Sequence, residues 1–361
     1  MKHKLLKMAG LLMALLMVFA GCATPTTNES IADADATPTV EETQLAIETD
    51  DASETDTASG DVLTVAITQI ADHPSLDMCR DGVVDKLAEL GYVDGESIKV
   101  DFQSAQGDMP TATSIAQQFV SGGADVIVAI ATPSAQAAFA AAKGKVPVVF
   151  TAVSEPSAAE LAAADGATIA GVTGSSDKLP VAATFDLIKS LTPDAVKVGI
   201  LHNTGEVNSD IQLAEAQKLA AEYGMEIVDA GITSTNEIAS ALDSLLPKVD
   251  VMMNLTDNMV VSALPLIVQK CNEAKIPLYG SEITQVEAGA LASAGVDYYV
   301  LGQMTGEMVA KVLEGAAPES LPITTFKDPV LIVNSDQATL LGVTVPDEIA
   351  DKVEYVTTKT E

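Results

Sequence analysis

The stretch Val126-Ile-Val-Ala-Ile130-Ala131-Thr132-Pro133-Ser134 decides the fold class. Five consecutive apolar residues, mostly β-branched, predict a buried strand over 126–130. Pro133 and Ser134 mark the start of a helix, because proline is favoured in the first helical turn and a hydroxyl is a common N-cap. A short strand that runs directly into a helix is typical of stacked βαβ units with a mostly parallel sheet.

The same alternation repeats on both sides of this stretch. We predict strands over 62–68, 98–102, 126–130 and 146–150, then over 196–201, 225–228, 249–254 and 276–279. Between them we predict helices over 75–90, 111–121, 134–142, 209–223, 236–246 and 259–274. Strands and helices alternate in the same way in both series, so the sequence predicts an α/β fold of two similar Rossmann-like lobes with parallel sheets.

The last part of the chain predicts crossings between the two lobes. A further strand and helix over 289–315 are expected to return to the first lobe, and residues from Leu321 onward to the second. The first lobe would comprise 61–173 plus about 285–320, and the second about 174–284 plus 321–361. The lobes would then be joined by a hinge that the chain crosses several times.

The N-terminus has the features of an export signal. Lys2, Lys4 and Lys7 precede an apolar run over 8–20, which is shorter than the roughly 20 residues of a membrane-spanning helix. Phe19-Ala20-Gly21-Cys22 resembles a bacterial lipobox, so we predict a signal peptide over 1–21 and lipidation of Cys22. The alternative is a soluble secreted protein with a free thiol at Cys22.

Residues 22–60 are rich in Thr, Ala, Ser, Asp and Glu and contain no Lys, Arg or aromatic residue. Such a composition cannot bury enough apolar surface to fold, so we expect a disordered acidic tether. The whole chain has a formal net charge of -32. Nucleic acid and anionic lipid surfaces are therefore not expected as partners. We expect the protein outside the cell, anchored to the outer face of the cytoplasmic membrane.

Ligands of open parallel sheets bind beyond the carboxyl ends of the strands, so two facing sheets predict a ligand site in a cleft between them. Residues that follow the predicted strands are the candidates. In the first lobe they are Gln69, Ile70, Thr132, Ser134, Thr151 and Ala152, and in the second they are Asn203, Ser209, Thr256, Asp257, Asn258, Ser281 and Glu282.

Two of these segments suggest what the ligand carries. The turn over 131–134 opens a helix, and a helix N-terminus with hydroxyls favours an anion such as a carboxylate. Asp257 could hold an ammonium group. Each residue has a structural alternative, because Ser134 and Asp257 could simply cap the helices that follow them.

Several chemistries lack their signals. His73 and His202 are the only histidines after residue 21, and neither lies in a metal-spaced cluster, so we expect no metal. Nucleophile-elbow, P-loop, dinucleotide and C-x-x-C motifs are missing from the sequence, so we expect no cofactor and no enzyme activity. Cys79 and Cys271 are expected to be buried and unpaired, although a disulfide is the alternative.

Sugars are less favoured as ligands than amino acids. Aromatic residues make up 4% of the chain and Trp is absent, whereas sugar sites usually use flat aromatic faces. Phe150 and Tyr279 lie near strand ends, where they could stack on a sugar. The alternative is that both pack in the core.

Five blocks in order along the chain resemble one family. They are 69–77, 129–133, 150–153, 256–258 and 296–299, and together they resemble bacterial ABC-transporter substrate-binding lipoproteins of the tryptophan/tyrosine type. The resemblance implies a type-I periplasmic-binding fold that closes over a small ligand, an amino acid and, by the family's name, an aromatic one. It implies ligand contacts from 131–134 and 151–154 in the first lobe, and from Asn203, Ser209 and Asp257 in the second. Ser281-Glu282-Ile283-Thr284 departs from the family's pattern.

The resemblance also implies partners. We expect a monomer that delivers its ligand to an ABC permease. The alternative is a lipoprotein that presents the ligand to a membrane signalling receptor. A two-lobed repressor is disfavoured, because the chain has an export signal and no N-terminal basic helix-turn-helix.

Overall fold

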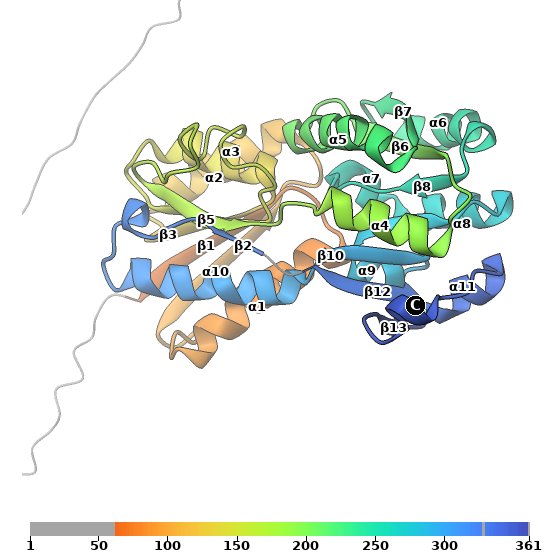
Figure 1. The fold of residues 1–361 in the computed structure, drawn as a ribbon. Helices are drawn as coiled ribbons and strands as arrows, with labels where there is room; N and C mark the ends of the chain where they lie inside the picture. Colours follow the sequence, from red (N-terminus) through yellow and green to blue (C-terminus); the bar gives the residue numbers. More distant parts are fainter. Residues whose placement is uncertain (1–61, 327–328, 360–361) are drawn as a thin grey trace, which may run out of the picture. The chain divides into compact units, whose positions relative to one another are not determined.

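The computed structural model describes residues 62–326 and 329–359, so the predicted signal peptide, Cys22 and tether lie outside the described residues. Two sheets organise this part of the chain (Figure 1), as the sequence predicts. The first has the order β11-β5-β4-β3-β1-β2 and is parallel throughout. Its strands are β1 (Leu63–Gln69), β2 (Ile98–Ser104), β3 (Val126–Ile130), β4 (Val148–Thr151), β5 (Val172–Ser176) and β11 (Thr324–Thr325).

The second sheet has the order β13-β12-β10-β9-β8-β6-β7, and only the pair β10 and β12 is antiparallel. Its strands are β6 (Lys197–Asn203), β7 (Glu226–Ile232), β8 (Val251–Met253), β9 (Leu278–Glu282), β10 (Ala292–Val296), β12 (Val330–Asn334) and β13 (Glu354–Val356). The β-branched run of β3 lies inside the first sheet and the apolar strand β8 inside the second, and every residue of both strands is buried.

Helices cover both faces of each sheet (Figure 1). In the first lobe, α1 (Pro74–Glu89) packs beside α10 (Tyr298–Leu313), and α2 (Met109–Ser121) packs beside α3 (Thr132–Ala142). The second lobe contains α4 (Val181–Leu191), α5 (Val207–Ala220), α6 (Ile238–Leu245), α7 (Asn258–Ser262), α8 (Leu264–Ala274), α9 (Ile283–Glu287), α11 (Ser335–Leu341) and α12 (Asp347–Ala350). Short 3-10 turns lie at Ala221–Tyr223, Thr235–Glu237, Leu246–Lys248 and Pro318–Ser320. Within the described residues, no helix has the length and apolar character needed to cross a membrane.

The predicted lobe boundaries were wrong in three places. β10 stays in the second sheet, although we assigned 285–320 to the first lobe, whereas α10 and the turn at Pro318–Ser320 do return to the first lobe. β11 belongs to the first sheet, although we assigned residues from 321 to the second. The boundary at 173 falls inside β5, which we did not predict because Thr-Gly-Ser-Ser has little strand propensity. Gly174 is required there, since a Cβ would lie 2.1 Å from the Phe150 carbonyl oxygen.

The predicted helix over 259–274 is broken into α7 and α8. Pro265 lies in the first turn of α8, where its ring and missing N–H prevent an unbroken helix. Phe150 and Tyr279 are fully buried, which confirms the core alternative for both. Cys79 and Cys271 are buried and free, as predicted.

Candidate functional site

The strand ends of both lobes line one inner cavity of about 10 Å³, which has room for about one water molecule. First-lobe segments after β1, β3 and β4 form one wall, and second-lobe segments after β8 and β9 form the other. Seven of the thirteen predicted ligand residues line it, namely Thr132, Ala152, Thr256, Asp257, Asn258, Ser281 and Glu282. These seven residues were predicted because they follow or end strands, and the structure does bring them together at the carboxyl ends of the two sheets.

A larger cavity of about 520 Å³ lies next to the inner one and shares Asn258 with it. Ile70 and Asn203, two more predicted residues, line this outer cavity together with residues of both lobes such as Asp72 and Glu206. Both cavities are thus bounded by both lobes.

The remaining four predicted residues lie behind the cavity walls. Thr151 pairs with Cys79 and Ser175 in the core, and Ser209 donates a 2.7 Å hydrogen bond to Asp257. Ser134 is fully buried in the first turn of α3, and its hydroxyl has no partner in the described chain. It is not the helix cap that we considered, because Ala131 occupies that position.

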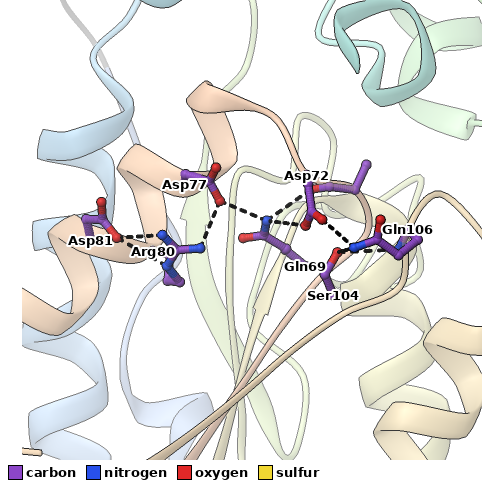
Figure 2. Close-up of polar contacts among 8 residues, drawn as sticks. Gln69, Asp72, Asp77, Arg80, Asp81, Ser104 and Gln106 are labelled. Atoms are coloured by element: carbon purple, nitrogen blue, oxygen red, sulfur yellow. Dashed lines mark hydrogen bonds and ion pairs between the residues drawn. The ribbon is translucent and has the colours of Figure 1, made fainter. Parts of the chain in front are cut away.

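Gln69 belongs to a polar network under the loop after β1 (Figure 2). Its amide nitrogen donates to the Ala71 carbonyl, to Asp72 and to Asp77, which also accepts from Arg80. Gln106 donates to Asp72 from the end of the neighbouring strand β2. Gln69 therefore supports the loop rather than facing the cavity.

Backbone strain marks the first-lobe wall. Ala131 and Ala152 have φ values of 76° and 55°, in a region that residues with a Cβ rarely adopt. They follow the neighbouring strands β3 and β4. Strain of this kind persists at ligand clamps, where the surrounding structure enforces it. The turns after β3 and β4, which carry the predicted residues Thr132 and Ala152, are therefore held in a strained backbone conformation by the surrounding structure.

Two buried carboxyl groups of the second lobe lie side by side. Asp257 caps α7 by accepting from the Val260 N–H at 2.9 Å, and its other oxygen accepts from the Asn203 N–H at 2.5 Å. The cap alternative is therefore confirmed for Asp257, which also lines the cavity. Glu206 accepts from side chains of Asn203, Asn208 and Asn258. Burial, and then the charge of Glu206, raise the pKa of Asp257 to about 7.

Two more buried acids complete the cavity wall. Glu282 caps α9 and accepts from Thr284 and from Ser75 of the opposite lobe, the latter at 2.9 Å. Asp177, just after β5, accepts from Ser154 and from the Tyr298 hydroxyl. Burial raises the pKa of both carboxyl groups. In the described residues, no Lys or Arg forms an ion pair with any of these four acids.

Hydrogen bonds connect the lobes beside the cavity. Ser154 of the first lobe pairs with Thr256 of the second at 2.9 Å, and Gln212 donates to Ser154 at 2.9 Å. Ser75 connects to Glu282 and Thr284 on the other side. These bonds exist only when the lobes lie close together.

Sequence reasoning missed one residue of this wall and did not single out two others. Asp177 was missed because β5 was not predicted. Glu206 and His73 end the strand-end segments 203–206 and 69–73, which could line the cleft or form polar loops, and both residues line a cavity. For His73, the position just after β1 was the available signal. In the part of the chain that the structure describes, no cluster of three potential metal ligands occurs.

Comparison with known proteins points to one family. The family model described as ABC transporter substrate binding protein matches residues 64–356. A tyrosine-binding protein of Clostridioides difficile (strain R20291) is 42% identical over 292 residues, which are 81% of this chain and 84% of that protein.

Two solved structures relate the fold to ligand state. The ABC domain in complex with L-Trp from Streptococcus pneumonia has a TM-score of 0.79 at 35% identity, covering 81% of this chain and 99% of that one. A ligand-free, open substrate-binding protein with adhesive properties from Clostridium difficile has a TM-score of 0.64 at 42% identity, covering 82% and 100%. The structure therefore superposes better on the L-Trp complex than on the open, ligand-free protein, despite the lower identity. Both neighbours share the type-I periplasmic-binding fold.

Proposed function

Because the chain belongs to the family of ABC transporter substrate-binding proteins, we propose that it captures an aromatic amino acid between its lobes and delivers it to the permease of an ABC importer. One observation carries the choice of ligand. The second-lobe walls of the two cavities are acidic, because Asp257 and Glu282 line the inner cavity and Glu206 the outer one. All three are buried and not paired with Lys or Arg in the described chain. Buried carboxyl groups of this kind favour a ligand that brings its own cation.

The inner cavity has room for only about one water molecule, so an amino acid would enter when the lobes are further apart, and the two walls would then orient it. The ammonium group turns to the acidic second lobe, near Asp257. The carboxylate turns to the first lobe, where the N-terminus of α3 and the Thr132 hydroxyl lie. Helix N-termini favour anions, so the charges of a zwitterion match the two walls. The tyrosine-binding relative and the L-Trp complex support an aromatic side chain.

Capture would use closure of the lobes. The hydrogen bonds from Ser154 and Ser75 to second-lobe residues form only in the closed arrangement. A ligand that contacts both walls binds this arrangement better than an open one, and so shifts the population toward it. The permease would recognise the closed protein, which we propose to be a monomer.

Thermal unfolding with a panel of ligands tests this proposal. The purified protein is heated alone and with each of the common amino acids, with sugars, purines and peptides as comparison sets. We expect the midpoint to rise with tyrosine, tryptophan or phenylalanine, because a ligand of the folded state stabilises it by mass action. A rise only with sugars or purines, or with no compound, would contradict the proposed ligand class.

We also propose export and anchoring. Residues 1–21 have the pattern of a signal peptide and Cys22 that of a lipid acceptor, and 22–60 would form the acidic tether. The protein would then stay on the outer face of the cytoplasmic membrane. In cells fed a radioactive fatty acid, Cys22→Ser should abolish labelling and release the protein into the soluble fraction. Undiminished labelling of this variant would refute lipidation at Cys22.

A further inference from the structure

His73 is a buried polar side chain whose role the fold does not explain. It follows β1, precedes the first residue of α1 and lines the inner cavity. Only 7% of its surface is exposed, and neither ring nitrogen makes a hydrogen bond of good geometry in the described chain, although the Asn258 side chain of the second lobe lies close enough to act on the pKa of His73. It also does not cap α1 through its side chain. Buried polar groups nearly always form hydrogen bonds, so two ring nitrogens without one, beside a cavity, indicate that a ligand supplies the hydrogen-bond partner.

The imidazole is neutral at ordinary pH. Burial lowers the pKa of His73 to about 4. A neutral imidazole has one N–H donor and one acceptor nitrogen, so it can donate to an anion without carrying a charge itself. In the cavity it is one of the few first-lobe groups with an unused donor, because the Ser75 hydroxyl already contacts Glu282 and Thr284.

The neighbours of His73 identify the ligand group that it would meet. Strands β1 and β3 are adjacent, so His73 lies on the same side of the cavity as Thr132 and the N-terminus of α3. Ser134, in the first turn of α3, is also fully buried without a hydroxyl partner. Of the acids that line this cavity, Asp257 and Glu282 belong to the second lobe, whereas Asp177 of the first lobe already accepts from the Ser154 and Tyr298 hydroxyls. The first-lobe side therefore fits a carboxylate.

The loop that carries His73 is fixed by hydrogen bonds from Gln69 and Gln106 (Figure 2). Gln69 donates to Ala71, Asp72 and Asp77, and Arg80 donates to Asp77 at 2.8 Å. Gln106 of the neighbouring loop donates to Asp72. A loop fixed at this many points presents the imidazole in one orientation, which lowers the entropic cost of binding.

We propose that His73 is a ligand-contacting residue, whose neutral imidazole donates a hydrogen bond to the carboxylate of the bound amino acid. This inference rests on the proposed function, because it requires an amino acid as ligand. His73 would act from the first lobe, beside Thr132 and the start of α3, while the ammonium group meets the second lobe. It would make the site selective for amino acids over the corresponding amines.

Calorimetric titration of two ligands tests the contact. The wild type, His73→Leu and the control His202→Leu are each titrated with L-tyrosine and with tyramine, or with L-tryptophan and tryptamine if tryptophan binds more tightly. His202 is an equally buried histidine in β6 that does not line either cavity. We expect His73→Leu to weaken amino-acid binding about tenfold or more and to change amine binding less than about twofold, since charged hydrogen bonds are the stronger kind. His202→Leu should change neither the affinity for the amino acid nor the affinity for the amine.

The outcomes separate the two proposals. If the wild type binds no amino acid, the proposed function fails and this inference fails with it. If the wild type binds but His73→Leu binds as tightly, or loses amine and amino acid equally, only the His73 contact is refuted. Equal losses would mean that His73 supports lobe closure and does not touch the carboxylate.

A spectroscopic measurement on the wild-type protein does not depend on how the variants fold. In protein labelled with ¹⁵N-histidine, the ring signals of His73 and His202 are assigned with the two variants or by their different environments. Saturating amino acid should slow exchange of the His73 ring proton and shift its signal, and the amine should not. A His73 signal that is unchanged by the amino acid would overturn the proposal.

Discussion

At the scale of single residues, the site is defined by carboxyl groups that the fold buries. Asp257 is fully buried, caps α7 and accepts three hydrogen bonds, yet burial and the neighbouring Glu206 raise its pKa from the ordinary 3.8 to about 7. An acid with a raised pKa prefers its protonated form in the folded state. Ionisation of Asp257 therefore destabilises the folded protein, and the ammonium group of a ligand would offset this loss of stability.

This balance predicts a pH dependence of stability. The stabilisation from protonated Asp257 is complete below about pH 4 and is lost as the pH rises through about 7. The difference in unfolding free energy between the wild type and Asp257→Asn should therefore change in this window, by at most about 1.4 kcal/mol per pH unit. Urea unfolding of both ligand-free proteins between pH 4 and 8 measures it. A constant difference would show that Asp257 stays ionised throughout.

At the scale of elements, the pair α1 and α10 shows how the first lobe is held together. Gly82 on α1 and Gly302 on α10 lie at their contact, where a Cβ would come within 2.2 Å of the Tyr299 carbonyl oxygen and within 2.1 Å of the Cys79 carbonyl oxygen. The helix backbones thus approach too closely for any side chain. Since α10 begins at Tyr298, which donates to Asp177, this packing also fixes one side of the cavity.

Gly302→Ala tests the close approach. In an isolated helix this substitution would stabilise by about 1 kcal/mol, but here the Cβ forces the helices apart. We expect a net loss of roughly 1–3 kcal/mol in unfolding free energy, measured by urea denaturation. Glu307→Ala, on an exposed face of the same helix, should stay within about 0.5 kcal/mol of the wild type. A stabilised Gly302→Ala protein would mean that α1 and α10 pack less tightly than described.

The elements also show what sequence reasoning could predict. The strands β1, β3 and β6 have long apolar runs, so periodicity located them to within two residues at each end. β5 was missed, because its pairing depends on the backbone approach at Gly174 and on neighbours distant in sequence. The candidate site followed from strand ends alone. Which strand-end residue faces the cavity depended on contacts that no local pattern encodes, as Gln69 and Asp177 illustrate.

At the scale of the whole described unit, closure is stabilised by protein contacts in addition to any ligand. Gln212 connects both lobes, since its amide donates to Ser154 and to Thr256, and its carbonyl accepts from the Thr256 N–H at 3.0 Å. It is 3% exposed. Such contacts raise the closed population before a ligand arrives, and so raise the apparent affinity.

Gln212→Leu should therefore shift the ligand-free protein toward open forms. We expect a larger radius of gyration by small-angle X-ray scattering without ligand, the wild-type value at saturating ligand, and an affinity weakened about tenfold. Gln217→Leu, exposed on the same helix α5, should match the wild type in all three. If the Gln212 variant keeps both the wild-type radius and the wild-type affinity, the contact does not bias closure.

The crossings between lobes affect how the chain can acquire its structure during synthesis. The first lobe needs α10 and β11, which are made only after five of the seven second-lobe strands. α1 can therefore pack against α10 only after more than 200 further residues have been synthesised. Contacts of such high sequence separation form slowly. The first lobe of the growing polypeptide thus stays incomplete until α10 and β11 have left the ribosome.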